Sequence, residues 1–254
     1  MAGKTATEER TGKRGPPRVT GGPGTAAMTV SLLSAIFTYA RDHEWVEANP
    51  CLGIEKPASR SRDRYLKPGE YKALRQALVD AEMDGTPETV TDAVRVIALT
   101  GCRVSEVLSL TWDAVDADAR CLRLADTKTG KQIRPCGAAA LAVIEARREK
   151  AAGDYVFPSR TKPGAPLATL KKPFNQIRDR AGLGPDVTLH ILRHSFATVA
   201  AEMDYSELTI AGLLGHAARG VTQRYAHRVD RALADAADQV SAEIERRMEE
   251  GAGG

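Results

Sequence analysis

The chain has 254 residues, of which 43% are hydrophobic, 5% aromatic and 27% charged, with 36 Lys and Arg against 33 Asp and Glu. This length and composition are typical of a globular protein of one or two domains and exclude a disordered or fibrous chain. The net charge of +3 neither requires nor excludes a nucleic-acid partner, so any such function has to rest on particular residues. The four cysteines form no CxxC pair, which argues against a zinc finger or disulfide framework and favours a reducing cytoplasm.

The N-terminal quarter predicts one helix behind a segment without a core. Residues 1–24 are rich in Gly and Pro, and we expect them to be flexible. From Met28 to Ala40 apolar residues recur at helical spacing, which predicts a helix capped by Thr25 or Thr29. This uncharged run is shorter than the roughly 20 apolar residues of a membrane span, so we expect no membrane association.

A polar, basic segment over residues 56–64 then predicts an interdomain linker, either solvated or lying along phosphates. The second domain is predicted to be mainly helical and to cover residues 65–250. Its apolar periodicity predicts helices at 68–82, 89–100, 103–110, 138–150, 167–181, 188–203, 206–214, 221–227 and 230–249.

One β-hairpin interrupts these helices. Leu122 and Leu124 alternate with polar residues, the sequence TKTG turns the chain, and Ile133 follows. This pattern is typical of a hairpin. The turn carries Lys128, and a short strand is expected at 155–157.

Single polar residues of this domain carry little weight alone. His190 and Arg193 are three apart on one predicted helix and share a face. Glu106 lies one turn after Arg103 and could hold its guanidinium, although isolated pairs of this kind are usually weak surface ion pairs.

Taken in order, four motifs are specific: TGCRVSEVLSLTW, TKTGKQIRP, HILRHSFAT and LLGHAARGVTQRYAH. Together they resemble the tyrosine recombinases, the phage integrase family. The residues that carry the resemblance are Arg103, Lys128, His190, Arg193, His216 and Tyr225. The resemblance implies a mainly α catalytic domain with a small antiparallel sheet, preceded by a helical core-binding domain. Residues 25–55 are interpreted as a remnant of that core-binding domain, and three explanations stay open: a truncated gene product, a wrongly chosen start codon or a natural minimal form.

The resemblance also implies a chemistry. Both arginines and His216 would hold a DNA phosphate, because guanidinium groups stay charged and bind phosphate oxygens in pairs. Tyr225 would attack the phosphate, with His190 as general base and Lys128 as general acid; Lys131 is the alternative acid. The product would be a 3′-phosphotyrosyl intermediate. No carboxylate cluster suited to a metal is evident in the sequence, so we expect no metal and no cofactor.

The implied partner is double-stranded DNA at a specific recombination site, bound by a homotetramer, with accessory DNA-bending proteins left open. We expect a cytoplasmic, nucleoid-associated protein that integrates or excises a mobile element. Candidates for contact with the DNA backbone are Lys56, Arg60, Arg62, Arg64 and Lys131. Two alternatives stay open: a type IB topoisomerase-like nicking-closing enzyme and a catalytically weak DNA-binding remnant. The final helix is expected to dock either on its own domain or on a neighbouring subunit.

Overall fold

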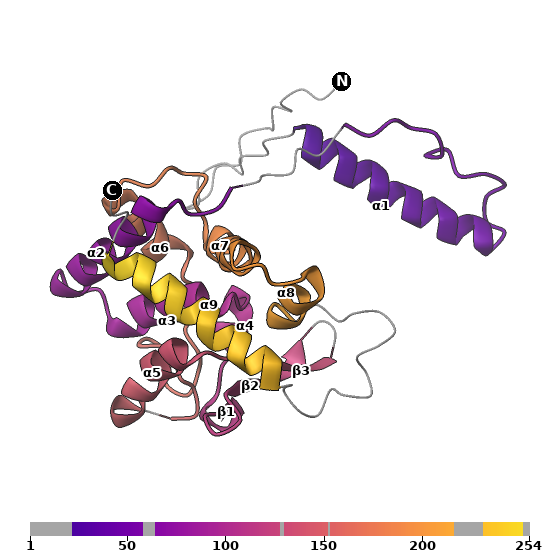
Figure 1. Ribbon diagram of the computed structural model, residues 1–254. Coiled ribbons are helices and arrows are strands. Elements are labelled where there is room, and N and C mark those ends of the chain that lie inside the picture. Colours follow the sequence, from indigo (N-terminus) through magenta and orange to yellow (C-terminus); the bar gives the residue numbers. More distant parts are fainter. Residues whose placement is uncertain (1–21, 58–63, 128–129, 152, 216–230, 251–254) are drawn as a thin grey trace. The chain divides into compact units, whose positions relative to one another are not determined.

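The computed structural model describes residues 22–57, 64–127, 130–151, 153–215 and 231–250. They form two compact units that divide before Arg64, and each unit is described by itself (Figure 1). The predicted flexible segment 1–24, apart from its last three residues, and the predicted helix 221–227 lie outside the described residues. The described elements are α1 (Pro23–Asp42), α2 (Pro68–Met83), α3 (Glu88–Thr100), α4 (Val104–Leu108), η1 (Trp112–Ala114), β1 (Val115–Asp116), β2 (Cys121–Thr127), β3 (Gly130–Pro135), α5 (Ala138–Ala146), η2 (Arg148–Lys150), α6 (Lys171–Arg180), α7 (Leu189–Glu202), α8 (Glu207–Leu213) and α9 (Arg231–Glu250).

The first unit is built on α1. The prediction that Thr25 or Thr29 caps this helix is wrong, because α1 already begins at Pro23; the fixed φ of proline suits the first helical turn. Asn49 holds the following loop against the helix. Its side-chain amide donates to the Ser34 carbonyl at 2.9 Å and the Thr38 hydroxyl at 3.0 Å. α1 contains no buried residue.

The core of the second unit surrounds α3. Nine of the 13 residues of α3 are buried, so this helix has almost no solvent face, as expected for a helix at the centre of a domain. It packs against α2, α5, α7 and α9. Tyr71, Ile97, Phe174 and Phe196 are among the largest fully buried side chains. The C-terminal end of α3 is therefore a rigid point from which the next residues project.

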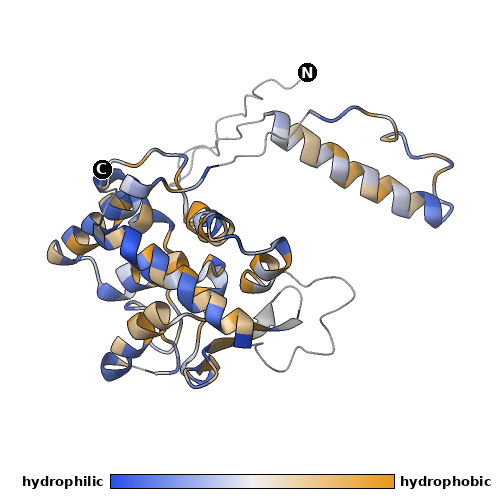
Figure 2. Ribbon diagram, viewed as in Figure 1, coloured by the Kyte–Doolittle hydropathy of each residue, from blue (hydrophilic) through white to orange (hydrophobic). Residues whose placement is uncertain are grey.

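The final helix docks on its own domain. α9 lies across the helices of this unit in Figure 1 and contacts α2, α3, α5, α7 and α8. Figure 2 shows hydrophobic and hydrophilic stretches alternating along α9, as an amphipathic helix requires. Val240 and Ile244 of its apolar stripe are completely buried.

The sheet has three antiparallel strands in the order β1-β2-β3. β2 and β3 form the predicted hairpin, with Leu122 opposite Arg134 and Leu124 opposite Gln132. β1 was not predicted, because two residues carry no periodicity. At the predicted strand 155–157 the structure has an isolated bridge between Tyr155 and Thr111. The predicted fold class, mainly helical with a small antiparallel sheet, is confirmed.

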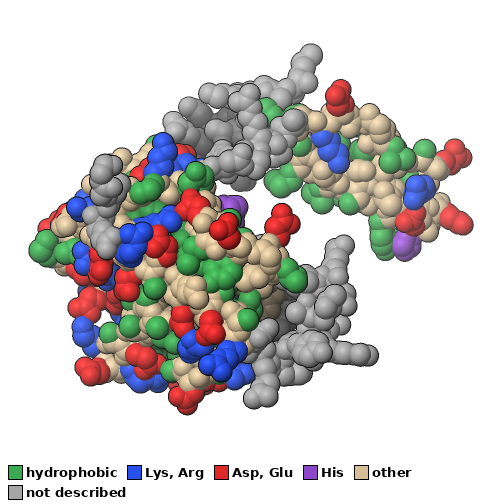
Figure 3. Space-filling view, viewed as in Figure 1, with side chains coloured by type: hydrophobic (Ala, Val, Ile, Leu, Met, Phe, Trp, Pro, Cys, Tyr) green, Lys and Arg blue, Asp and Glu red, His purple; other side chains and the backbone are tan. Residues whose placement is uncertain are grey.

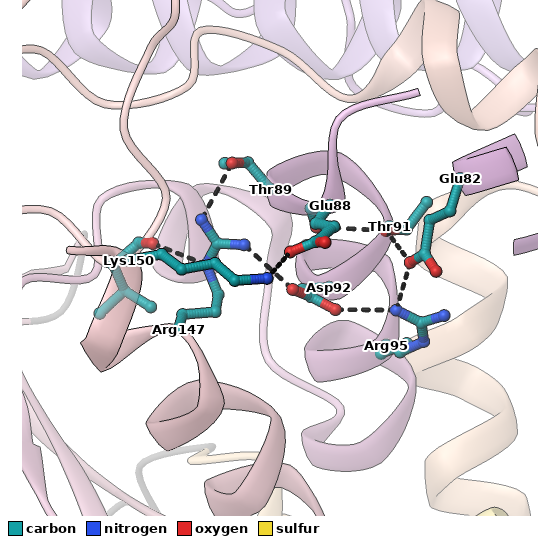
Figure 4. Close-up of polar contacts among 9 residues, drawn as sticks. Glu82, Glu88, Thr89, Thr91, Asp92, Arg95, Arg147 and Lys150 are labelled. Carbon is teal, nitrogen blue, oxygen red and sulfur yellow. Dashed lines mark hydrogen bonds and ion pairs between the residues drawn. The ribbon is translucent and has the colours of Figure 1, made fainter. Parts of the chain in front are cut away.

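A buried arginine joins α3 to the segment after α5 (Figure 4). Arg147 donates to the Val156 carbonyl at 3.0 Å, to Asp92 at 3.0 Å and to the Thr89 hydroxyl at 2.9 Å. Asp92 also accepts from Arg95 at 2.8 Å. Arg147 is only 7% exposed, so its polar contacts are shielded from water.

Charges of both signs are mixed over the face of the second unit that Figure 3 shows. This agrees with the small net charge of the chain. No helix among the described residues has the length and apolar character needed to cross a membrane.

We expect Arg147→Met to lower the free energy of unfolding by about 2–4 kcal/mol, because it leaves the Val156 carbonyl buried without its donor and removes one partner of Asp92. Urea denaturation followed by circular dichroism measures this. The control is Lys150→Met, which removes an exposed ion pair with Glu88 and should cost less than about 1 kcal/mol. Equal effects of the two substitutions would contradict this account.

Candidate active site

Arg103 and Glu106 lie at the start of α4, directly after the turn that ends α3. Gly101 ends α3 with a φ of +62°, a left-handed conformation that glycine adopts readily. Arg103 is the N-cap residue of α4, and Glu106 lies in its first turn. The Arg103 backbone N–H donates to Glu106 Oε2 at 2.8 Å, and Arg103 Nη1 donates to Oε1 at 2.7 Å. The carboxylate therefore fixes both the backbone and the guanidinium of Arg103; the sequence had indicated only the guanidinium contact.

The same carboxylate binds a second arginine from the sheet. Arg134 Nη2 donates to Glu106 Oε1 at 2.7 Å. Arg134 is 1% exposed and Glu106 6%, whereas the Arg103 side chain is 44% exposed. Glu106 thus links a guanidinium buried in the domain to one that faces solvent.

Arg193 enters the cluster from α7. Its Nη1 donates to the Gly101 carbonyl at 2.5 Å and its Nη2 to the Leu214 carbonyl at 3.0 Å. These carbonyls belong to the turns after α3 and at the end of α8. A planar guanidinium can bridge the two turns because its donors have a fixed fork geometry.

His190 lies one helical turn before Arg193 and is exposed. Its ring packs edge to face against the exposed His194, with centroids 4.5 Å apart. The prediction that His190 and Arg193 lie on one helix is confirmed.

The charged residues of this cluster shift one another's pKa values. Burial is the main cause that lowers the pKa of Arg193 to about 10, and the charges of Arg134 and Arg103 add to it. Partial desolvation, together with His194, Arg193 and Arg103, lowers the pKa of His190 below 6.5. Burial opposes ionisation of Glu106, but the Arg103 backbone and Arg134 hold its pKa below the usual value. At neutral pH the site therefore combines a neutral imidazole with charged guanidinium groups.

Several predicted site residues lie outside this cluster or outside the described residues. Lys128, His216 and Tyr225 lie outside the described residues, as do Arg60, Arg62 and the side chain of Lys131. Lys56 is exposed in the first unit. Arg64 belongs to the second unit. Its guanidinium pairs with Glu70 at 2.6 Å and with Asp186 at 2.7 Å. A role of Lys56 and Arg64 in DNA contact stays a prediction.

Arg134 is the site residue that the sequence analysis missed. One signal was available. Leu122 and Leu124 of β2 are buried, and their partners Arg134 and Gln132 in β3 point to the same face of the sheet, because paired residues share a face. An arginine on the same face as these buried leucines faces the core, so its charge is buried, and buried charges are paired. The alternation along β3 therefore indicated that Arg134 has a carboxylate partner.

Cys102, next to Arg103, is 2% exposed. Burial raises the pKa of its thiol, so the thiol stays protonated at neutral pH and is a poor nucleophile. Cys102 therefore belongs to the core of the domain.

A carboxylate that aligns guanidinium groups, with a neutral histidine beside them, is suited to a phosphate group. Guanidinium forks match phosphate oxygens, and an anion relieves the repulsion between neighbouring arginines. The described part of the site thus has the chemistry of an anion-binding site of the kind that phosphate-binding proteins use.

Comparison with known proteins gives the family. The model of the phage integrase family matches residues 64–231. The tyrosine recombinase XerC of Xylella fastidiosa (strain M23) is 29% identical over 206 residues, covering 78% of this chain and 68% of its own. The tyrosine recombinase XerD of Listeria monocytogenes is 27% identical over 220 residues, covering 81% and 72%. For a XerC of Xanthomonas axonopodis the match spans 60% of that relative.

Solved structures agree with the sequence comparison. A lambda integrase (75–356) dimer bound to a COC′ core site has a TM-score of 0.62 and 25% identity, over 77% of this chain and 73% of that one. The XerA recombinase has a TM-score of 0.52 and 25% identity, over 84% and 75%. The chain belongs to the phage integrase family, the tyrosine recombinases, whose members break and rejoin DNA.

We expect Glu106→Gln to lower the free energy of unfolding by about 3 kcal/mol at neutral pH, because it leaves the buried Arg134 without a counter-charge. The pKa of Glu106 is lowered in the folded protein. Its stabilisation is therefore complete above the unfolded pKa of 4.5 and is lost as the pH falls through the lower folded value. Urea denaturation of both proteins at a series of pH values measures this. A difference between them that stays constant down to acid pH would contradict the prediction.

Proposed function

We propose that the chain is a site-specific DNA recombinase that cuts and rejoins strands through a 3′-phosphotyrosyl intermediate. The observation that carries the proposal is the Glu106-centred cluster, in which Arg103 and Arg193 lie beside His190 at the end of α3. The family match supports it.

Arg103 and Arg193 would hold the scissile phosphate. The Arg193 guanidinium is held in place by its bonds to the Gly101 and Leu214 carbonyls, and the exposed Arg103 guanidinium faces solvent. Attack on a phosphodiester increases the charge on its non-bridging oxygens. Donors fixed in advance stabilise that charge without rearranging. His216 is proposed to add a further donor.

Tyr225 is proposed as the nucleophile. A tyrosine hydroxyl has a pKa of about 10, so attack at neutral pH requires a base. His190 is suited to this, because its lowered pKa leaves the imidazole neutral and able to accept a proton. Lys128 is proposed to protonate the departing 5′ oxygen, with Lys131 as the alternative.

The covalent bond between Tyr225 and the 3′ phosphate would replace the broken phosphodiester. A 5′ hydroxyl of another strand can then attack it, which reforms a phosphodiester and releases Tyr225. The reaction needs no external energy source, because one phosphodiester is exchanged for another of similar energy.

The domain assignment is part of the proposal. Residues 65–250 are the catalytic domain, 56–64 a basic linker, 25–55 a remnant of the core-binding domain and 1–24 a flexible segment. Lambda integrase has been solved as a dimer on a core site and as a tetramer on a Holliday junction. By analogy we propose a homotetramer on double-stranded DNA that integrates or excises a mobile element in the cytoplasm, on the nucleoid.

The test is covalent capture on a library of nicked DNA duplexes with randomised sequence around the nick. A nick just 3′ of the scissile phosphate lets the short fragment that carries the new 5′ hydroxyl diffuse away, so rejoining is blocked and the protein stays trapped on the DNA. We expect denaturation-resistant adducts enriched in one sequence, and none with Tyr225→Phe. Tyr205→Phe is the matched control, because Tyr205 bonds to Gln239 and has no part in the proposed chemistry. Adducts without sequence preference would indicate a topoisomerase-like activity, and an absence of adducts would overturn the proposal.

The rate of adduct formation should rise with pH and then level off. If His190 accepts the proton, the rising limb reports the pKa of His190, which partial burial and neighbouring positive charges lower in the protein without DNA. Single-turnover rates on the captured duplex at a series of pH values measure this midpoint. His190→Asn should abolish the limb and slow the reaction about 10²- to 10⁴-fold. A rising limb that survives this substitution would assign the base to another group.

A further inference from the structure

Arg134 is a charged side chain in a fully buried position, which is unusual in a protein core. It is the largest fully buried side chain of the described residues, and one of its three nitrogens donates to Glu106. Its Nε and Nη1 are buried without a hydrogen-bond partner among the described residues. Unpaired buried donors cost free energy, and a side chain that only filled this space would not carry that cost. Stability alone does not account for this arginine.

The second face of Arg134 meets the turn at the end of α8. Gly215 has a φ of +60°. A Cβ built on Gly215 would lie 1.6 Å from Arg134 Nη1 and 2.3 Å from its Cζ. The guanidinium therefore packs directly against the backbone of Gly215, the residue that precedes His216. It touches Glu106 on one side and this turn on the other.

We propose that Arg134 is a positioning residue that couples the Glu106–Arg103 pair to the Gly215 turn, so that both sides of the phosphate site keep a fixed spacing. Arg134 is buried and does not itself reach DNA. It acts through Glu106, whose Oε1 accepts from both Arg134 and Arg103, and through Gly215, against which its guanidinium packs. This inference rests on the proposed function, because it concerns the same phosphate site.

The primary test compares single-turnover adduct formation, DNA affinity by gel shift, and melting temperature, on the duplex captured from the randomised library. Arg134→Met should slow adduct formation about 10- to 100-fold, since small displacements of reacting groups have effects of this size. It removes one partner of the buried Glu106 carboxylate, so it should also lower the melting temperature, while DNA affinity stays close to wild type. The control is Arg147→Met, which removes another buried arginine. It should lower the melting temperature, but at temperatures where the variant is folded it should leave the rate of adduct formation unchanged.

A double-mutant cycle separates coupling from simple packing. If Arg134 acts through Glu106, Arg134→Met should slow the reaction little further once Glu106→Gln is present. Rates are measured at a temperature at which all variants are folded. Independent, multiplicative effects would overturn the proposal, as would an unchanged rate in folded Arg134→Met.

Gly215→Ala tests the other face without altering Arg134. Its matched control is Gly182→Ala, because Gly182 has a similar φ of +66° but nothing within 4 Å of an added Cβ. Both substitutions strain the backbone, and only Gly215→Ala displaces the Arg134 guanidinium. We expect a loss of rate for Gly215→Ala alone, and equal rates would overturn the proposal. If the wild-type protein forms adducts and Arg134→Met forms them at the same rate, only this inference is refuted. If the wild-type protein forms no adduct, the proposed function is refuted.

Discussion

The carboxylate of Glu106 is the interaction on which the site depends. It accepts hydrogen bonds from the backbone and guanidinium of Arg103 and from Arg134. Without this anion, the end of α3 would bring guanidinium groups together with nothing to offset their repulsion. A phosphate entering the site would meet donors that are already oriented, which is how preorganised electrostatic sites lower a barrier.

The scaffold explains why this cluster can be held in place. α3 is enclosed by α2, α5, α7 and α9, so its end cannot move without disturbing the core. Gly101 reverses the chain there and turns its carbonyl toward Arg193. The site therefore draws on helices α4 and α7, the turn after α8 and strand β3. Its exposed members, Arg103 and His190, lie beside buried supports, which suits a surface that must receive a large substrate.

The sequence predicted the helices well where apolar periodicity was long, as in α2 and α7, and it predicted the β2–β3 hairpin from its alternation. It also paired Glu106 with Arg103 from their spacing. The prediction failed where the local sequence signal was weak. β1 has only two residues, too few to show an alternating pattern, and α1 begins at Pro23 instead of after a threonine cap. Arg134 was missed because its partner is 28 residues away, and only the strand register reveals its burial.

The most direct test of the central claim is a crystal structure of the Tyr225→Phe protein bound to the duplex captured from the randomised library. The account predicts that Arg103 and Arg193 both donate to the non-bridging oxygens of one phosphate. It also predicts that Glu106 keeps its contacts with Arg103 and Arg134. A phosphate held by other residues, or a Glu106 carboxylate turned away from both arginines, would contradict it.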